Sequence, residues 1–378
     1  MCIRTSAEGL ELPLAFVSPG AQIGPNGDVL TISLKKTPTL EVYDFSGQIK
    51  QYASPVYFRR IGPRTPPVAL NLGMWASETP PVGDATALGV FGAGAFGNHT
   101  YRGATIYRVG AETISARMRI PLSWSVEQGS VLLAVGDNIF LQGIPSPPGL
   151  GAITEVDTKT GRIVHSYAVR GIPYTSTHGL FVGNTSAGWI ESLVVDRGHL
   201  YAFQFDSQAA AIDDLSDGTR HLLPGYSSLG GGVVGADGAL YVMAWSEKSR
   251  PTFDILRIDP FNLSIISTTH TGIRATSVDN AQMQALPGGS IIAFVAQQRE
   301  NQVNPMTNYL WKLSGSHLER TNLPANSGLD MRAFADGIYV FGGPGRNVVT
   351  RVSLSNLSLM RTAPSLTTPA GTWIFALT

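Results

Sequence analysis

The stretch from Gly231 to Thr269 reads GGVVGADGALYVMAW, then a polar gap, then FDILRIDPFNLSIISTT. Its first part contains two β-rich runs around Ala236-Asp237-Gly238, a sequence that suits a hairpin turn with its glycine at positive φ. Its second part contains two more such runs, Phe253–Asp259 and Leu263–Thr268, on either side of Pro260-Phe261-Asn262. Four short antiparallel strands in about 40 residues are the content of one β-propeller blade.

The same unit recurs along the chain, which favours a repeat architecture over a single meander. Arg257–Thr268 aligns without gaps with Arg351–Thr362, and Glu155–Ser166 fits the same frame. A small turn before an apolar run recurs at Asn26-Gly27, Gly83-Asp84, Asp137-Asn138, Arg197-Gly198, Asp237-Gly238, Gly288-Gly289 and Asp336-Gly337. These turns are spaced by roughly 40 to 60 residues, which is typical of propeller blades.

The sequence therefore predicts an all-β fold: a seven-bladed β-propeller of four-stranded antiparallel blades, forming a single domain over residues 1–378. The blades are expected at about 21–53, 68–121, 130–169, 191–224, 231–269, 281–324 and 329–363. Strand-like segments at both termini, Leu10–Phe16 and Gly371–Thr378, are expected to close the ring, because closure removes exposed strand edges.

The charge and hydropathy of the chain exclude several classes of partner. The 27 Lys and Arg residues equal the 27 Asp and Glu residues, and no basic run occurs, which argues against nucleic-acid binding. No apolar run approaches the roughly 18 residues of a membrane span, so we expect no transmembrane segment. We expect a monomer.

The single cysteine, Cys2, follows Met1 directly and excludes an internal disulfide. It is either an ordinary terminal residue or the lipidated first residue of a bacterial lipoprotein whose signal peptide was replaced by Met. Asn-X-Ser/Thr sequons at Asn98, Asn184, Asn262 and Asn356, together with a charged fraction of only 14%, favour a secreted or extracytoplasmic protein. Repeat descent alone also explains the matching pair Asn262 and Asn356.

Blade geometry predicts where a binding site would lie. With the strands of a blade lettered A to D from the axis outward, the A–B and C–D turns lie on one face, and the B–C loops and blade-to-blade connections lie on the other. The second set is longer in this sequence, and binding residues concentrate on long loops held by a rigid scaffold. We therefore expect a ligand pocket on that face, near the axis, where loops around 92–103, 171–190 and 298–307 converge.

The residues expected on that face combine histidine, arginine and aromatic side chains, which suits a polar or anionic ligand with a flat part. His99 and His178 are the candidate catalytic residues, since both fall in the middle of predicted loops. The candidate ligand-binding residues are Tyr101, Arg102, Tyr174, Gln282, Arg332 and Trp75. The other histidines fall in or beside strands or at outer edges and are expected to be structural or surface residues: His165, His199, His221, His270 and His317.

Metal and cofactor motifs are absent from the sequence. It has no His-Glu-x-x-His, no cysteine pair, no EF-hand-like loop, no Gly-x-Ser-x-Gly elbow and no phosphate loop ahead of a helix. We therefore expect no metal and no cofactor.

The C–D hairpins resemble those of quinoprotein-like and YncE-like propeller repeats, in which a hydrophobic-Asp-x-x-Thr-Gly-Lys-hydrophobic pattern recurs. Val156–Ile163 matches this pattern, and Ile258–Leu263 matches it in part. The resemblance implies the propeller architecture over most of the chain but no activity, because the motif is structural. The cysteines and repeat tryptophans that accompany quinone cofactors are missing, so the resemblance does not imply that cofactor.

Two classes of function remain open. One is a metal-independent enzyme that acts on a small organic molecule in the central funnel, as a lyase, cyclase, isomerase or lactone hydrolase. The other is an exported binding or scaffold propeller that recognises a protein or a glycan. A deep pocket lined by histidine and arginine would favour the enzyme, and a flat aromatic face would favour the binder.

Overall fold

In the computed structural model, every regular element of the described residues is a β-strand. The described residues are 2–5, 10–13, 22–23, 29–33, 39–43, 49–53, 71–75, 86–90, 104–109, 114–120, 131–135, 138–143, 152–157, 160–169, 172–173, 189–205, 209–246, 250–275, 278–298, 306–324, 327, 330–334, 337–341 and 349–362. Before residue 133 the description covers the backbone alone. Within these residues no helix is long and apolar enough to cross a membrane.

The chain divides into two compact units, which are described separately. Unit 1 consists of Met1–Ser166, Gly342–Asn347 and Ala363–Thr378, and unit 2 consists of Tyr167–Phe341 and Val348–Thr362.

The described residues of unit 1 form a two-stranded hairpin and three four-stranded antiparallel sheets. The hairpin pairs β1 (Cys2–Thr5) with β2 (Leu10–Pro13). The first sheet consists of β3 (Gln22–Ile23), β4 (Val29–Ser33), β5 (Thr39–Tyr43) and β6 (Ile49–Ala53). The second consists of β7 (Asn71–Trp75), β8 (Thr86–Val90), β9 (Ala104–Val109) and β10 (Ile114–Ile120). The third consists of β11 (Val131–Val135), β12 (Asn138–Gly143), β13 (Ala152–Asp157) and β14 (Ile163–Ala168), whose last two residues belong to unit 2.

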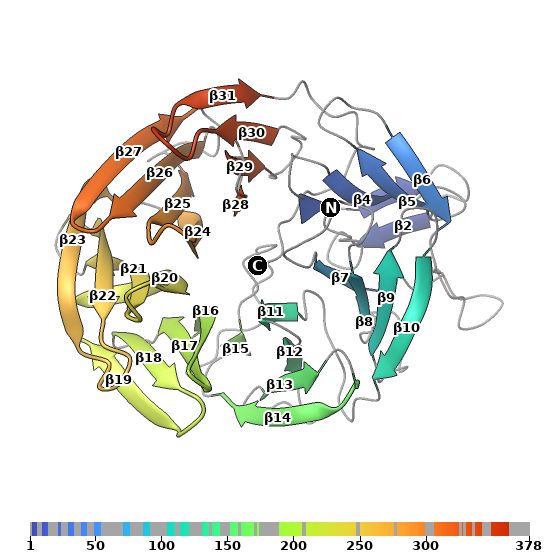
Figure 1. The fold of residues 1–378 in the computed structure, drawn as a ribbon, viewed down its shortest axis with the longest axis horizontal. Coiled ribbons are helices and arrows are strands. Elements are labelled where there is room, and N and C mark those ends of the chain that lie inside the picture. Colours follow the sequence, from blue (N-terminus) through green and yellow to red (C-terminus); the bar gives the residue numbers. More distant parts are fainter. Residues whose placement is uncertain are drawn as a thin grey trace. The chain divides into compact units, whose positions relative to one another are not determined.

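Four further sheets are described in unit 2, drawn from green to red in Figure 1. The first consists of β16 (Trp189–Asp196), β17 (His199–Phe205), β18 (Ala210–Asp214) and β19 (Thr219–Leu223), with β15 (Ile172–Pro173) added in parallel to β16. The second consists of β20 (Tyr226–Val234), β21 (Leu240–Ser246), β22 (Thr252–Ile258) and β23 (Ile265–Arg274). The third consists of β24 (Val278–Ala285), β25 (Ile291–Gln298), β26 (Met306–Ser314) and β27 (His317–Leu323). The fourth consists of β28 (Asp330–Phe334), β29 (Gly337–Phe341), β30 (Val349–Val352) and β31 (Leu359–Thr362).

Each predicted blade thus corresponds to one described four-stranded meander with antiparallel pairing throughout. The expected closing strand near Leu10 is found as β2, whose described partner is β1 rather than a strand of a four-stranded sheet. The other expected closing strand, at 371–378, lies outside the described residues. Closure of the ring therefore stays a prediction.

The hairpin predicted at Asp237-Gly238 has the expected geometry. The Gly238 N–H donates to the Gly235 carbonyl (2.9 Å), the Gly235 N–H donates to the Ala239 carbonyl (2.8 Å), and Gly238 has a φ of 74°. Gly289 has the same pattern, with a φ of 81°. Glycine is favoured at this position because it has no Cβ to clash in the left-handed region. The prediction of a positive-φ glycine is confirmed.

The hairpins that join the third and fourth strands confirm the sequence alignment of the repeats. In the β22–β23 hairpin the Leu263 N–H donates to the Asp259 carbonyl (2.8 Å), and in the β30–β31 hairpin the Leu357 N–H donates to the Ser353 carbonyl (3.0 Å). The aligned Gly161 N–H donates to Asp157 (2.8 Å) in the same way. All three residues have positive φ: 70° for Gly161, 56° for Leu263 and 53° for Leu357. Two leucines therefore adopt a backbone conformation that normally favours glycine.

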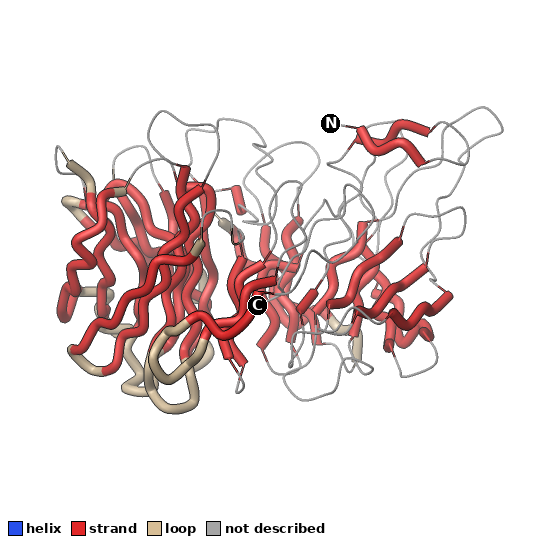
Figure 2. The backbone as a smooth tube through the Cα atoms, turned by 90° about the horizontal axis from the view of Figure 1, so that it is seen from above, coloured by secondary structure: helices blue, strands red, loops and turns tan. Residues whose placement is uncertain are grey.

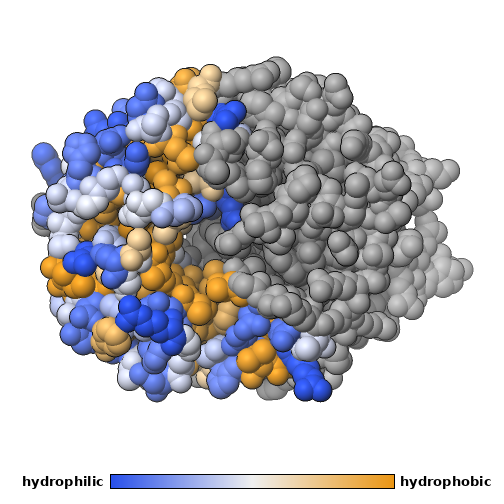
Figure 3. All heavy atoms as spheres, in the orientation of Figure 1, coloured by the Kyte–Doolittle hydropathy of each residue, from blue (hydrophilic) through white to orange (hydrophobic). Residues whose placement is uncertain are grey.

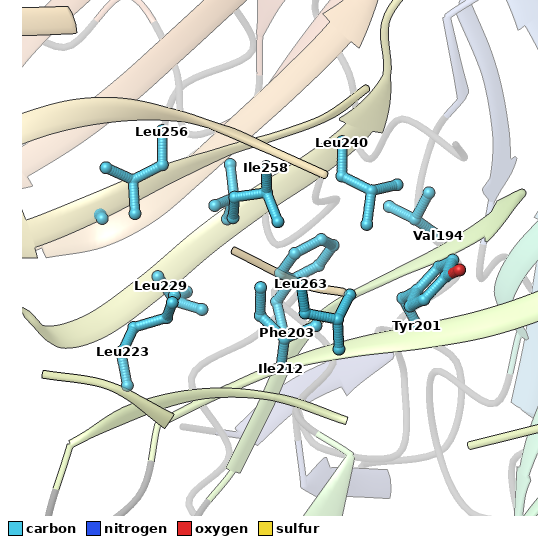
Figure 4. Packing of buried hydrophobic residues seen from close by; sticks show 13 residues of the cluster. Val194, Tyr201, Phe203, Ile212, Leu223, Leu229, Leu240, Leu256, Ile258 and Leu263 are labelled. Carbon is cyan, nitrogen blue, oxygen red and sulfur yellow. The ribbon is translucent and has the colours of Figure 1, made fainter. Parts of the chain in front are cut away.

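The four sheets of unit 2 pack face to face through their apolar side chains. Successive inner strands β16, β20, β24 and β28 contact one another, and the outer strands β19, β23, β27 and β31 lie at the rim (Figure 1). Figure 4 shows one interface, where Phe203 and Ile212 of one sheet meet Leu240, Leu256 and Ile258 of the next. Two further clusters of buried residues fill the next two interfaces, around Trp311 and around Phe294.

This arrangement explains the hydropathy pattern of the strands. A middle strand such as β25 is buried on both faces by neighbouring sheets, so seven consecutive residues, Ile291–Gln297, are buried. The outer strand β23 is mostly exposed, and its middle residues, Ser267–Thr271, are polar, although Ile265 and Ile266 at its start are also exposed. Figure 3 shows hydrophilic residues predominating at the rim of unit 2, with apolar residues between them.

Each sheet of unit 2 has two distinct ends. The turn end carries the hairpins between the first and second and between the third and fourth strands. The linker end carries the segments that join the second strand to the third and one sheet to the next. Figure 2 shows the strands running between these ends. In unit 2 some linker-end segments are no longer than the turn-end hairpins, for example 206–209 and 247–251 against 235–239 and 259–264. Others, 174–188 and 299–305, are longer than any turn-end hairpin of unit 2, in line with the expected contrast.

Candidate functional site

The structure describes three of the eight predicted site residues. Trp75 is the last residue of β7, where only the backbone is described. Gln282 lies in the inner strand β24, and Arg332 lies in the inner strand β28. The other five lie outside the described residues: His99, His178, Tyr101, Arg102 and Tyr174. The site prediction as a whole stays a prediction.

Gln282 and Arg332 are 50 residues apart in the sequence, and the fold brings their strands side by side. The Met331 N–H, next to Arg332, donates a hydrogen bond of 2.7 Å to Gln282 Oε1. Gln282 and Arg332 are both partly buried, and each makes a further interaction. Two of the predicted ligand-binding residues therefore belong to one connected part of the inner strands.

Gln284, which is not among the predicted site residues, makes a second bridge between the same two strands. Its Oε1 accepts the Ala333 N–H at 2.7 Å, and its Nε2 donates to the Ala333 carbonyl at 2.7 Å. A side-chain amide offers one acceptor and a donor group, which matches the two backbone groups of one residue in a strand edge. The spacing of two residues between Gln282 and Gln284 was the signal available, because it places both side chains on one face of a strand.

A charged cluster outside the predicted site residues lies at the turn end of the β16–β19 sheet. His199 Nδ1 lies 2.6 Å from Asp214 Oδ2, and the Ser216 N–H donates to Asp214 Oδ1 at 2.9 Å. The Asp214 side chain is 6% exposed, whereas that of His199 is 45% exposed. The contact gives His199 a specific structural role: its imidazole partners the carboxylate of Asp214, which would otherwise be buried without a charged or polar side-chain partner.

Potential ligand atoms of His199, Asp214 and Asp217 lie within 4.8 Å of one another. Each has a protein partner that accounts for its position, since Asp217 Oδ1 accepts the Thr219 N–H at 2.8 Å. We therefore interpret the group as the support of the β18–β19 turn. The adjacent Tyr201 donates to the Pro260 carbonyl at 3.0 Å, and burial, followed by the charges of Asp214, Asp196 and Asp217, raises the pKa of Tyr201 to about 12.

A second histidine–aspartate pair lies toward the linker end of the β20–β23 sheet. His270 Nδ1 lies 2.8 Å from Asp254 Oδ1, and the Tyr226 hydroxyl donates to Asp254 Oδ2 at 3.5 Å. The Asp254 side chain is 2% exposed and that of His270 is 65% exposed. His270 lies on the outermost strand of its sheet, away from the inner strands, which agrees with the expectation of a structural or surface residue.

At the turn end of the same sheet, Asp237 accepts three hydrogen bonds. Its Oδ2 accepts from Tyr241 Oη (2.9 Å) and Arg257 Nε (2.8 Å), and its Oδ1 accepts the Ala239 N–H (3.2 Å). Burial raises the pKa of Asp237, but the bonds from Ala239, Tyr241 and Arg257 outweigh it, so the net pKa lies below the usual value.

This network predicts a pH-dependent contribution to stability. Because the folded protein holds the Asp237 pKa below the unfolded value of 3.8, its contribution is complete above that pH and is lost as the pH falls through the folded pKa. We expect the difference in unfolding free energy between the wild type and Asp237→Asn to shrink from pH 6 to pH 3 in urea denaturation. The effect will be modest, because the side chain is 38% exposed and therefore screened. A difference that grows on acidification would contradict this account.

Comparison with known proteins adds support for the fold. No family model matches the chain, and no curated protein matches it. The chain is similar in structure to the periplasmic gluconolactonase of Pseudomonas aeruginosa, with a TM-score of 0.52 and 14% identity over 89% of this chain and 93% of that one. It is similar to a 6-phosphogluconolactonase candidate of Bacteroides uniformis, with a TM-score of 0.50 and 10% identity over 87% and 91% of the two chains.

A prolyl endopeptidase is also similar, with a TM-score of 0.51 and 13% identity over 93% of this chain, which spans 51% of that longer protein. At 10–14% identity, these likenesses concern the fold alone. Together with the successive four-stranded antiparallel meanders, they show that this chain has a β-propeller fold.

Proposed function

We propose that the protein is a closed seven-bladed propeller, a single domain of quinoprotein-like or YncE-like repeats, with a small-molecule site in its central funnel. The seven described sheets, six of four strands and one of five, support this arrangement, as does the high mutual coverage with the two lactonase-named neighbours. In such a ring the inner strands of all blades converge at the axis, and the connections at the linker end surround the mouth of the funnel.

The observation that carries the proposal is the placement of Gln282 and Arg332, both predicted for one site, on the adjacent inner strands β24 and β28. Gln282 Oε1 accepts the N–H of Met331, the residue next to Arg332, at 2.7 Å. An arginine held on an inner strand is suited to bind an anionic oxygen, because its guanidinium stays protonated at all relevant pH values. His99, His178, Tyr101, Arg102, Tyr174 and Trp75 complete the proposed site.

The reaction we propose is hydrolysis of a lactone, which is the activity named for two of the similar structures. A neutral histidine, His99 or His178, removes a proton from water as the water oxygen bonds to the lactone carbonyl carbon. Arg332 stabilises the oxyanion that forms on the carbonyl oxygen. The ring C–O bond then breaks, the leaving oxygen takes the proton from the histidine, and a hydroxy acid is released.

We further propose that this reaction requires no metal or cofactor and takes place outside the cytoplasm. The periplasmic origin of one similar protein and the low charged fraction of 14% support the second point.

The test uses the full chain with glucono-1,5-lactone and 6-phosphogluconolactone as probes, and follows acid release. We expect His99→Ala or His178→Ala to lower kcat by about 10²- to 10⁴-fold, the usual contribution of a general base. We expect Arg332→Ala to lower kcat/KM by about 10- to 100-fold, since a hydrogen bond to a charged group contributes about 1.5–3 kcal/mol. His317→Ala and Arg320→Ala are matched controls on the outer strand β27, expected to keep full activity.

Full activity in all three site variants would refute the assignment of these residues, and loss of activity with a chelator alone would refute the metal-independent reaction. A wild type that hydrolyses neither probe and binds no gluconate would refute the lactonase proposal. That result would favour the second candidate from the sequence, a propeller that binds a protein or a glycan.

A further inference from the structure

We propose that Gln282 and Gln284 are positioning residues, whose side chains clamp β28 and so hold Arg332 in place for the oxyanion and carboxylate of the ligand. This inference rests on the proposed function, because it concerns the same site. It changes the expected role of Gln282, which the sequence analysis selected as a direct ligand contact.

The clamp consists of three short hydrogen bonds from one inner strand to the next. Gln282 Oε1 accepts the Met331 N–H, Gln284 Oε1 accepts the Ala333 N–H, and Gln284 Nε2 donates to the Ala333 carbonyl, all at 2.7 Å. β28 pairs with β29 on one side only, so its other edge has no neighbouring strand among the described residues. The two glutamines supply hydrogen-bond partners that a neighbouring strand would otherwise supply.

The hydrogen bonds of the clamp are made to the residues directly before and after Arg332, Met331 and Ala333. Met331 and Ala333 are 4% exposed and belong to the apolar cluster between the β24–β27 and β28–β31 sheets. Because successive residues of a strand face opposite sides, the Arg332 side chain leaves the strand on the face opposite to these buried neighbours. The backbone from which the arginine extends is thus fixed by hydrogen bonds and by packing.

Met283, between the two glutamines, packs in the opposite direction, within the cluster that includes Met243 and Phe253. The strand β24 is therefore held on one face by apolar packing and on the other by its bonds to β28. A rigid support of this kind matters at a binding site, since a displacement of about 1 Å can lower a rate by about 10²-fold.

The test compares variants that remove the clamp with variants that preserve part of it. Gln282→Met and Gln284→Met keep the approximate length of the side chain and remove its hydrogen bonds, whereas Gln282→Glu keeps an acceptor for the Met331 N–H. Gln297→Met is the matched control, because Gln297 is buried in the same sheet and its Nε2 donates instead to the Arg274 carbonyl (3.3 Å).

Two readouts separate the clamp from the chemistry. Amide hydrogen exchange at Met331 and Ala333 reports the hydrogen bonds directly. The inhibition constant of gluconate and the kcat/KM for glucono-1,5-lactone report how well Arg332 binds the anionic oxygens of the ligand. For the double Gln282→Met, Gln284→Met variant we expect faster exchange at both amides, and a rise of about 10- to 100-fold in the gluconate inhibition constant. Gln282→Glu should restore slow exchange at Met331, and Gln297→Met should change neither readout.

The decisive comparison repeats the glutamine substitutions in the Arg332→Ala background. If the clamp acts through Arg332, the glutamine substitutions will have no further effect on gluconate binding there. An equal effect in both backgrounds, or faster exchange with unchanged binding, would overturn the inference while the proposed function stands. A wild type that hydrolyses neither lactone and does not bind gluconate would overturn the proposed function and this inference together.

Discussion

Replacing Gly231 with alanine is expected to lower the free energy of unfolding by about 2–5 kcal/mol. Gly231 lies in the inner strand β20 at a break in the pairing register between Gly230 and Gly232, and it has a φ of 61°. A side chain in this left-handed region costs about 1–2 kcal/mol. A Cβ there would also lie 2.8 Å from the Met283 backbone nitrogen and 2.9 Å from the Gln282 carbonyl carbon. Overpacking of this kind typically costs about 1–3 kcal/mol.

The close contact is with backbone atoms of β24, which cannot turn aside as a flexible side chain could. The β20 and β24 strands therefore approach each other closely only because residue 231 has no side chain. Gly225→Ala is the matched control, because Gly225 has a φ of 89° and a Cβ there would meet nothing within 4 Å. For Gly225→Ala we expect the free energy of unfolding to fall only by the cost of the backbone conformation, about 1–2 kcal/mol. Equal losses for the two variants in urea denaturation would show that the β20–β24 contact contributes nothing.

Leu263→Ala is expected to lower the free energy of unfolding by about 2–5 kcal/mol, the usual range for a buried leucine. Leu263 is 6% exposed, within the cluster between the first two sheets of unit 2, and it has a φ of 56°. Burial of a leucine contributes about 1.5–3 kcal/mol, which exceeds the cost of about 1–2 kcal/mol for its backbone conformation. The leucine is therefore retained where the aligned repeat has Gly161.

This balance predicts an unusual order of stability at position 263. Leu263→Gly loses the same packing as Leu263→Ala but relieves the backbone strain, so it is expected to be more stable than Leu263→Ala by about 1 kcal/mol. The same order is expected for Leu357, which is 3% exposed with a φ of 53°. An alanine variant more stable than the glycine variant at both positions would contradict the argument.

The positions of the sheets could be predicted from the sequence because each blade is specified locally. A hairpin with a residue at a left-handed position favours glycine there, and Gly238 and Gly289 supply it within a few residues of the strands that they join. The repeated frame at 155–166, 257–268 and 351–362 likewise depends on short-range contacts, and the same hydrogen bonds are found in all three hairpins. Because these contacts are local, the residues that make them recur at matching positions of each repeat and can be recognised in the sequence.

The candidate site could be predicted only in part, because its contacts join residues far apart in the chain. Gln282 and Gln284 reach Met331 and Ala333, 49 residues away, and nothing in the local pattern of β24 indicates these partners. The histidines show the same limit. The sequence predicts a structural or surface role for His199 and His270, but it does not indicate their partners. The buried Asp214 and Asp254 lie 15 and 16 residues away, on neighbouring strands of the same sheets.

The sequence by itself determined the all-β character of the described residues, the antiparallel meanders and their approximate bounds, because turn chemistry and apolar runs act over a few residues. The β20–β23 sheet, at 226–274, extends five residues beyond the expected 231–269 at each end. The tertiary structure alone decided which face of each strand meets which neighbour. It gave Gln282 a backbone partner, placed Leu263 in a core that outweighs its strain, and required Gly231 to lack a side chain. These outcomes depend on sheets packing against sheets, where distance in space is unrelated to distance along the chain.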